Sequence, residues 1–511
     1  MWKKIVQNYS DGLPDFNNYL IKGFRQDKVR QIPEYLDKLF HQSIEILKGI
    51  VPNEQAEYRG YVELSPKERI EYLRERSSQG KRFDIRPTKS KMVQYTFRFN
   101  DEDHHMVIEV PYIYNEAVLL EGIEYYPIFA IIEKGGMTRF QNEIVLQVMR
   151  ARLKFWRNDR GVVRTTDGDI FKEVNVTCKL HQSNKGKRKR PPILVYHLCK
   201  FGFEETMKYY GVHGRIALVY SETVPQKIGK KYVGVGPSIF LEIDEDIVKN
   251  SSEQYCRRIV VSLMNIYQFN TSFKFQDLLE IGYYRVTLGK WTYPSVKPET
   301  LLYNNATTHL SMNESMLDPA AQHQHRSIGI DSKNLDHLLL LIFQNIDKWL
   351  TNYVPNDLYE KKIGTLDQMM AGLVRNFNNR LFKSIVNSKT KLKRENIVGL
   401  MKSVSRSKWL NSSSMFRSKP TFYNPNWLLT VGGKQFRSID NTELSDGGNY
   451  GRSLPIELLR AHPSQISVVS ILSYPSSNLV VSGTINPFLK IDSDGNIIKP
   501  ENFSKLEKVF D

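Results

Sequence analysis

The spacing of apolar residues changes character along the chain, and this change limits the fold more than any other feature. Between Ile32 and Val51 apolar residues recur at helical spacing, and Pro52 ends the pattern. From Met92 to Ile132 they alternate as in β-strands. From Asp331 to Leu350 an apolar stripe again follows the helical repeat, with Asp331 as the expected N-cap. This order predicts an α+β fold in which a strand-rich middle separates two helical stretches.

Weaker patterns give further expectations. We expect helices at 142–156, 203–210, 253–269, 365–387 and 394–404, and short strands at 162–164 and 193–196. Residues 303–326 are rich in Asn, Thr, Ser, His and Gln, which favours a long loop or a domain boundary. After Asn411 the sequence becomes rich in turn-forming residues.

The chain has 511 residues, which is enough for about three domains with real hydrophobic cores. Its longest uninterrupted apolar run, Leu338–Phe343, is far shorter than the ~20 residues of a membrane helix. The N-terminus lacks the apolar stretch of a secretory signal, and three cysteines fit a reducing compartment. We therefore expect an intracellular protein without a membrane anchor.

The positive charge is concentrated in one part of the sequence. The formal net charge is +17, and between Ala371 and Arg437 there are fourteen Lys or Arg residues and one acid, Glu395. Aromatic residues such as Trp409 and Trp427 are interleaved with these cations. Dense cations neutralise phosphates and planar rings stack on bases, so this segment predicts contact with nucleic acid; the alternative is a solvated basic surface. A second basic run, Lys185–Arg190, is more typical of an exposed hairpin or loop.

The sequence lacks the motifs of most enzymes. It contains no nucleophile elbow, no phosphate-binding P-loop and no dinucleotide-binding glycine motif. Acids occur at two-residue spacing at Asp101/Asp103, Asp167/Asp169 and Asp492/Asp494, and in one run of three, Glu242, Asp244 and Asp246. Turns and helix starts explain these pairs better than a two-metal centre, which needs several carboxylates gathered around cations. Cys178, His181, His197 and Cys199 do not have a usual zinc spacing.

The C-terminal eighty residues carry the most specific motifs. In order they are Gly447-Gly448, His462-Pro463-Ser464, Tyr474-Pro475, Asn478, Ser482 to Asn486, and Asp494-Gly495. This series resembles the fork region of the β subunit of multisubunit DNA-dependent RNA polymerases. Three segments further upstream resemble other parts of that subunit in the same order: 12–16, 110–125 and 187–206.

The sequence also departs from the β pattern. Ser476-Ser477 stands where the family has Glu-Gly. The family's paired arginines before the Gly-Gly turn are replaced by Gln435-Phe436-Arg437, with extra residues inserted. Divergence on this scale, in a chain that ends soon after the fork motifs, is similar to the split polymerases of giant bacteriophages, in which β is encoded as separate polypeptides.

The resemblance implies a role in templated nucleotidyl transfer without catalysis by this chain. Mg²⁺ would be bound by another subunit, and the isolated chain would be inactive. The implied partners are a β C-terminal fragment, β′ fragments, the DNA template and nascent RNA, in the cytoplasm of a bacterial host. The implied domains are a protrusion (1–140 and 331–405), a lobe (141–330), and the fork with the start of the channel wall (406–511).

Charge and resemblance together suggest specific residues. Those expected to contact nucleic acid are Arg375, Arg380, Lys391, Lys393, Arg394, Lys434, Arg437, Arg452 and Asn478. Gly447, Gly448, His462 and Pro463 would shape the fork turns, and we expect His462 to be a packed, hydrogen-bonded histidine of such a turn. The alternative function is a basic nucleic-acid-binding structural or packaging protein without polymerase partners.

Overall fold

The structure is a computed structural model. It describes residues 32–50, 56–78, 90–111, 118–120, 123–127, 129–140, 142–148, 152–180, 190–314, 316–317, 319–351, 357–364, 373–374, 377–378, 380–381, 394–405, 416–418, 435–438, 462–468, 483–484, 486, 489–492 and 495–500. The chain divides into two compact units: Met1–Lys134 with Val354–Asp511, and the inserted Gly135–Tyr353. Helices and antiparallel sheets occur in both, so the predicted α+β class is confirmed.

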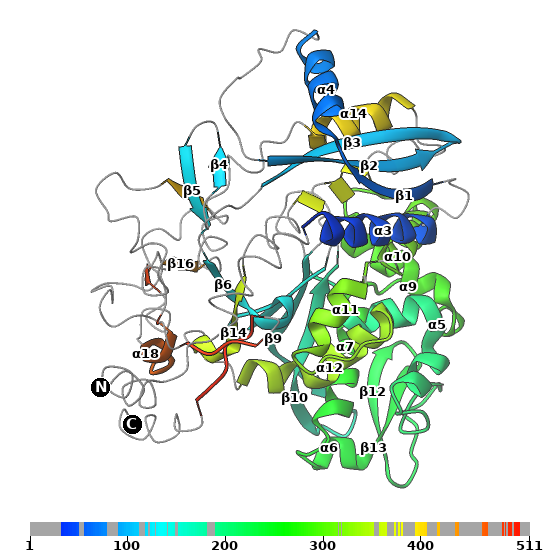
Figure 1. The fold of residues 1–511 in the computed structure, drawn as a ribbon. Helices are drawn as coiled ribbons and strands as arrows, with labels where there is room; N and C mark the ends of the chain where they lie inside the picture. The colour runs from blue at the N-terminus through cyan, green and yellow to red at the C-terminus, as the bar shows by residue number, and fades with distance from the viewer. Residues whose placement is uncertain are drawn as a thin grey trace, which may run out of the picture. The chain divides into compact units, whose positions relative to one another are not determined.

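The first unit contains an antiparallel sheet in the order β1-β2-β3 (Figure 1). Its strands are β1 (Ala56–Glu63), β2 (Ser90–Phe99) and β3 (Glu102–Pro111), and α4 (Pro66–Ser78) connects β1 to β2. Helix α3 (Ile32–Ile50) contacts β1, and α14 (Arg394–Ser405) contacts β3. Phe40 of α3 is fully buried against the rings of Tyr95 and Phe97 on β2.

Two further sheets complete the described part of this unit. One has the order β15-β5-β4, built from β4 (Val118–Leu120), β5 (Ile123–Pro127) and β15 (Phe416–Ser418). The other has the order β14-β6-β16-β17, built from β6 (Phe129–Glu133), β14 (Lys361–Gly364), β16 (Gln435–Ser438) and β17 (Gly483–Thr484). Two short helices accompany them, η3 (Leu358–Glu360) and α18 (Ser464–Val468).

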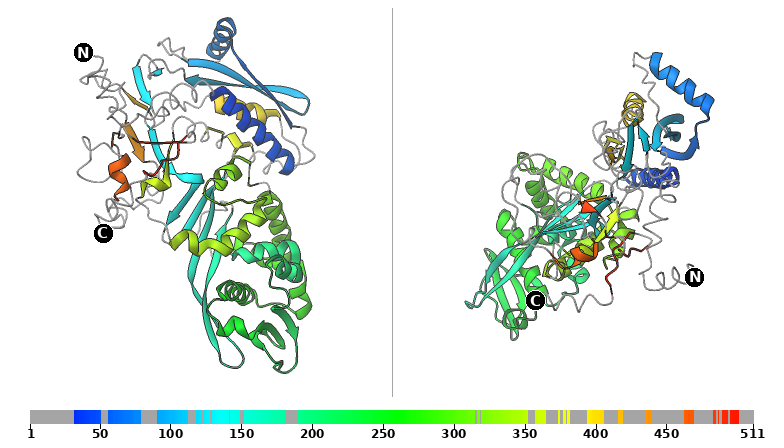
Figure 2. Two further views of the ribbon diagram at one scale, coloured as in Figure 1. Left: turned by 60° about the horizontal axis from the view of Figure 1, so that its bottom comes forward. Right: turned by 60° about the vertical axis from the view of Figure 1, so that its left-hand side comes forward.

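The inserted unit begins with the turn η2 (Lys134–Gly136) and contains two sheets. The larger has the order β10-β9-β8-β7, from β7 (Met137–Phe140), β8 (Glu143–Gln147), β9 (Arg152–Arg164) and β10 (Ile170–Lys179). Its long β9–β10 hairpin is visible in both views of Figure 2. The smaller has the order β11-β13-β12, from β11 (Ile216–Tyr220), β12 (Lys230–Gly236) and β13 (Ile239–Asp244).

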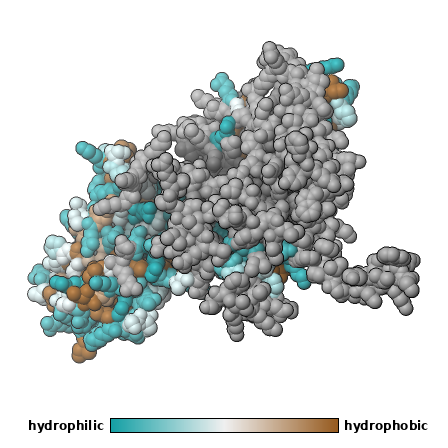
Figure 3. Space-filling model, turned by 90° about the vertical axis from the view of Figure 1, so that its left-hand side faces the viewer, coloured by the Kyte–Doolittle hydropathy of each residue, from teal (hydrophilic) through white to brown (hydrophobic). Residues whose placement is uncertain are grey.

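Helices pack on these sheets and form one large hydrophobic core. They are α5 (Ile193–Tyr209), α6 (Glu245–Lys249), α7 (Gln254–Phe269), α8 (Phe275–Leu279), α9 (Ile281–Thr292), α10 (Glu299–Glu314), α11 (Pro319–Arg326) and α12 (Leu335–Thr351). Helix α7 contacts β9 and β10, and α12 contacts β8 and β9. In Figure 3, apolar side chains lie singly among polar ones on the coloured surface.

Several predicted elements are confirmed. The helices expected at 32–51, 253–269 and 394–404 are α3, α7 and α14, and the strands expected in 92–132 are β2 to β6. The helix expected at 331–350 is α12, but it begins at Leu335. Asn334, rather than Asp331, accepts the N–H of His337 in its first turn (2.8 Å), while Asp331 pairs with Arg326. Most of 365–387, and the glycine-rich segments after Asn411, lie outside the described residues.

Three predictions are wrong. Segment 142–156 contains β8 and the start of β9, and Ile144, Leu146, Leu153 and Phe155 join the large core from alternate positions. Residues 193–196 begin helix α5, which is buried all round here, so its sequence lacks a polar face. Residues 303–326 form most of α10 and all of α11. The buried positions of α10, Leu302, Ala306, His309 and Asn313, follow helical spacing, but two of them are polar.

None of the helices in the described part of the chain is long and apolar enough to span a membrane.

Candidate functional site

The residues predicted to contact nucleic acid fall mostly outside the part that the structure describes. Arg375, Lys391, Lys393, Lys434, Arg452 and Asn478 lie outside it, as do Gly447 and Gly448. Arg380 is exposed. The backbone of Arg394 begins α14, and that of Arg437 belongs to β16. His462 and Pro463 are described completely.

Strand β16 places the backbone of Arg437 inside a sheet made from distant parts of the sequence. Arg437 is paired with Ala130 of β6 in parallel register, and its neighbour Phe436 is also paired with Gly483 of β17. On the other side of β6, Lys361 to Gly364 form β14. Strand β16, from the motif segment 435–437, therefore pairs with β6, and β17, from the motif segment 482–486, pairs with β16.

The His-Pro-Ser motif forms a turn that begins α18. Nδ1 of His462 lies 2.8 Å from the Ser464 hydroxyl and accepts the Ser464 N–H at 3.2 Å. The Ser464 oxygen in turn accepts the main-chain N–H of Leu358 at 2.8 Å. Asp357 Oδ1 is 3.7 Å from His462 Nδ1, and only 18% of the histidine side chain is exposed. His462 is thus a hydrogen-bonded histidine of a turn that is fastened to η3.

The Asp-x-Asp-Gly motif forms a second turn on the same sheet. Both carboxylate oxygens of Asp492 accept hydrogen bonds from Asn496, one from the main-chain N–H and one from the side-chain amide, each at 2.8 Å. Gly495 has a positive φ of 82°, which favours glycine. Its carbonyl accepts the N–H of Ile363 on β14 at 2.7 Å. Asp492 therefore holds a tight turn against β14.

Helix α18 and the Asp492 turn share one small hydrophobic core with β6, η3 and β14. Its members are Ile131, Leu358, Tyr359, Ile363, Val468, Leu489, Ile491 and Ile497. They come from β6, from η3 and β14, and from the C-terminal segments around α18 and the Asp492 turn. This core, together with the pairing of β16 to β6, brings C-terminal segments up to about sixty residues apart onto a common scaffold. We call it the fork scaffold, after the motifs that these segments resemble.

One buried lysine, Lys361, and one half-buried lysine, Lys134, lie in the fork scaffold. Lys361 pairs with Glu133 across the β14–β6 register, and their side chains are 7% and 4% exposed. Lys134 donates to the carbonyl of Tyr359, and burial lowers the pKa of its ammonium group. Sequence reasoning missed the Glu133–Lys361 pair, because its partners are 228 residues apart.

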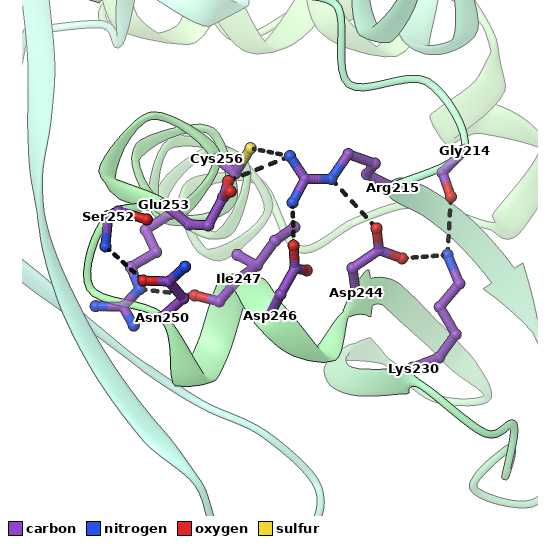
Figure 4. A network of polar contacts seen from close by, with 11 residues as sticks. Gly214, Arg215, Lys230, Asp244, Asp246, Ile247, Asn250, Ser252, Glu253 and Cys256 are labelled. Carbon is purple, nitrogen blue, oxygen red and sulfur yellow. Dashed lines mark hydrogen bonds and ion pairs between the residues drawn. The ribbon is translucent and has the colours of Figure 1, made fainter.

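The acidic pairs outside the fork scaffold are bound by cations. Arg215 contacts Asp244 (3.2 Å), Asp246 (2.6 Å) and Glu253 (3.2 Å), as Figure 4 shows. Lys230 adds a second cation on Asp244 at 2.6 Å. These contacts occupy the carboxylates with protein cations. They join the start of β11 to the end of β13 and to α7.

Lys231 contacts both Asp167 and Asp169, at 3.1 and 3.0 Å, and Arg98 lies 3.9 Å from both Asp101 and Asp103. Among the described residues no group of three or more His, Cys, Asp or Glu side chains has an arrangement suited to a metal ion. The carboxylates of these pairs lie next to basic side chains of the protein itself.

His197 belongs to the core rather than to a zinc site. Its Nδ1 lies 2.7 Å from the Tyr210 hydroxyl, and its Nε2 lies 3.1 Å from the main-chain oxygen of Asp336. Burial lowers its pKa to about 4. Cys178 and Cys199 are buried free thiols whose pKa values burial raises above the usual range. His181 lies outside the described residues.

The second basic run is described only at its last residue. The guanidinium of Arg190 lies 3.5 Å above the centre of the Trp156 ring, and the indole N–H of Trp156 donates to Glu143 at 2.8 Å. Arg190 is therefore held by a cation–π contact against β9.

Comparison with known proteins identifies the class. Residues 1–500 match the family described as "Non-virion RNA polymerase subunit". The chain belongs to this family of RNA polymerase subunits. No curated protein matches it. The expectation that the chain is a component of an RNA polymerase assembly, with other polymerase subunits as partners, is confirmed at this level.

Proposed function

We propose that the chain is the N-terminal β-like subunit of a phage-encoded, multisubunit DNA-directed RNA polymerase of the split type. In this proposal, the C-terminal region forms the fork beside the nucleic-acid channel. The chain supports templated nucleotidyl transfer, and the metal site lies on other subunits.

The observation that carries the proposal is the common scaffold of the C-terminal motifs. Segments 435–437, 462–464, 483–484 and 495–497 occur in the order of the β fork motifs. The first and third pair in the sheet of β6 and β14, and the other two are hydrogen-bonded to η3 and β14. Motifs that matched by chance would have no reason to converge on one scaffold.

The basic segment between Ala371 and Arg437, which we call the basic window, supports the proposed contact with nucleic acid. The backbone of Arg437 is held in β16, and α14, which begins at Arg394, packs on β3. Both elements belong to the first unit, which also contains the fork scaffold. We propose that the cations between Arg375 and Arg437, together with Arg452 and Asn478, line the channel and contact DNA template or nascent RNA.

The remaining roles follow the same proposal. Mg²⁺ is bound by another subunit, and the carboxylate pairs described above support this because protein cations occupy them. The partners are a β C-terminal fragment and β′ fragments, and transcription takes place in the host cytoplasm. The compact unit Gly135–Tyr353 is inserted between two parts of the other unit, which supports the proposal of a lobe inserted into a protrusion.

Site-specific photo-crosslinking tests the channel assignment. A photoreactive amino acid replaces Arg437 in polymerase assembled on a DNA template with a short RNA. We expect covalent products with template strand or RNA. The same amino acid at Lys249, which is 65% exposed in the inserted unit, is the matched control.

Crosslinking at 437 no stronger than at 249 in an active complex would contradict the channel assignment. The rival function, a structural or packaging protein, predicts crosslinks to DNA in the absence of any other polymerase subunit.

A further inference from the structure

Strand β11 forms one edge of the small sheet of the inserted unit. The order β11-β13-β12 leaves β11 with a single neighbour. Main-chain hydrogen bonds from Asp244 N–H to Arg215 and from Ser221 N–H to Ser238 flank the ladder. Since bonded pairs alternate in an antiparallel ladder, the odd-numbered residues of β11 bond to β13 and the even-numbered ones face the other side.

The even-numbered residues present unused main-chain groups at this edge. The N–H of Ile216 donates to Val212, but those of Leu218 and Tyr220 have no acceptor, and their carbonyls have no donor, within the continuously described stretch 190–314. Leu218 is half-buried and Tyr220 is 57% exposed. Partly buried peptide groups of this kind gain free energy when a second strand supplies partners.

Strands β1 and β12, which lie at two other sheet edges, carry features that discourage pairing. Strand β1 has three charged side chains and a bulge between Tyr58 and Gly60. Strand β12 begins with two lysines and has a bulge between Gly234 and Gly236, and its Tyr232 carbonyl accepts the N–H of Thr166. Strand β11, with the sequence Ile-Ala-Leu-Val-Tyr, has no charge, proline or bulge. Exposed edges that lack such features pair readily with other chains.

Apolar side chains lie next to the open edge. The Tyr220 ring is 5.9 Å from the ring of Phe275, and Leu279, one turn further along α8, is 41% exposed. A strand added to β11 would place every second side chain over this apolar surface. A segment that fits this edge would therefore be extended and have apolar residues at alternate positions.

We propose that β11 is a docking edge at which an extended segment of another subunit of the polymerase adds a fourth strand. Main-chain hydrogen bonds to Leu218 and Tyr220 would supply affinity, and contacts with Tyr220, Phe275 and Leu279 would supply specificity. The assignment of the occupant rests on membership of a family of polymerase subunits, which assemble with other chains. It is independent of the β-like role.

Amide hydrogen exchange at single-residue resolution tests the proposal without any substitution. The full chain is measured alone and in the polymerase isolated with its other subunits. We expect the amides of Leu218 and Tyr220 to exchange rapidly in the free chain and at least about 100-fold more slowly in the polymerase. The amides of Ala217 and Val219, bonded to β13, are slow in both.

Leu218→Pro gives an independent test. Proline removes an N–H that points away from β13, so the edge strand tolerates it, whereas an added strand loses a hydrogen bond. We expect this variant to lose the protection at Tyr220 in the polymerase, while Leu218→Ala, which keeps the N–H, retains it. Equal exchange of Leu218 and Tyr220 in the free chain and the polymerase would overturn the proposal. Protection that appears in the chain alone as its concentration rises would also overturn it, since the occupant would then be a second copy.

Discussion

The Lys361 ammonium and the Glu133 carboxylate form a buried ion pair between β14 and β6, directly opposite each other in the register. The pair joins the strand that precedes the inserted unit to one that follows it in sequence. Its position in the fork scaffold means that the stability of the C-terminal motifs depends on it.

Loss of one partner of this pair should unfold the fork scaffold more readily than loss of both. Glu133→Leu or Lys361→Met alone removes the opposite charge of this pair from a buried ionised group, at a cost of about 3–5 kcal/mol. The double variant should recover most of that loss, because an apolar pair of similar volume carries no desolvation penalty. Chemical denaturation, monitored by hydrogen exchange of β6 and β14, measures the stability of the single variants and of the double variant. A double variant as unstable as the sum of the single variants would contradict this role.

Two glycines of α9 should respond in opposite directions to alanine. A Cβ atom at Gly289 would lie 2.6 Å from the carbonyl oxygen of Leu302 on α10, whereas one at Gly282 would meet nothing within 4 Å. We expect Gly289→Ala to destabilise the inserted unit by about 1–3 kcal/mol. Gly282→Ala should be neutral, or stabilising by up to about 1 kcal/mol, because alanine favours helix. Thermal unfolding of the two variants checks the close approach of the helices.

His197 should make the inserted unit less stable in acid. Its pKa is lowered to about 4 by burial, so the unfolded chain binds a proton on this residue at higher pH than the folded chain does. The stabilisation is complete above the ordinary pKa of about 6.5 and is lost as pH falls toward 4, by up to about 3 kcal/mol.

His197→Gln can keep both hydrogen bonds without titrating, and it should flatten this part of the curve of unfolding free energy against pH. His213→Gln, the same substitution at an exposed histidine of the inserted unit, controls for the exchange of histidine for glutamine itself. An unchanged slope in the His197 variant would show that its proton is not released on folding.

The basic window should contribute sequence-independent affinity for nucleic acid. Replacing Lys391, Lys393 and Arg394 with alanine should weaken binding to all sequences. It should also reduce the slope of log affinity against log salt by about one unit for each phosphate that the variant no longer neutralises. Binding isotherms at several salt concentrations give the slope. A slope equal to that of the wild type would mean that these side chains face solvent.

Sequence patterns predicted the elements whose buried faces are apolar. Helices α3, α7 and α12 have such faces, and the alternate buried residues of β2 form another. Helix α10 was missed because His309 and Asn313 occupy buried positions in it. At 142–156, further apolar side chains lie between the alternating ones, and this spacing predicts a helix. The segment is instead extended, because β8 pairs with β7 and β9 pairs with β10. Patterns within the sequence carry no information about such partners.

The candidate site shows the same limit. The motif series after Gly447 was visible in the sequence, yet the scaffold beneath it depends on β6 and β14, which have no motif of their own. The turn at Asp492 was predicted from its Asp and Gly residues, and Asn496 completes it. The role of Lys361 depends on Glu133, which no local pattern indicates.

Native mass spectrometry of the complex purified through a tag on this chain tests the central claim most directly. We expect one copy of the 59.5 kDa chain in an assembly with several large polymerase polypeptides, among them a β C-terminal fragment and β′ fragments, active in template-dependent RNA synthesis. A chain recovered alone, or with nucleic acid but without those polypeptides, would contradict the claim.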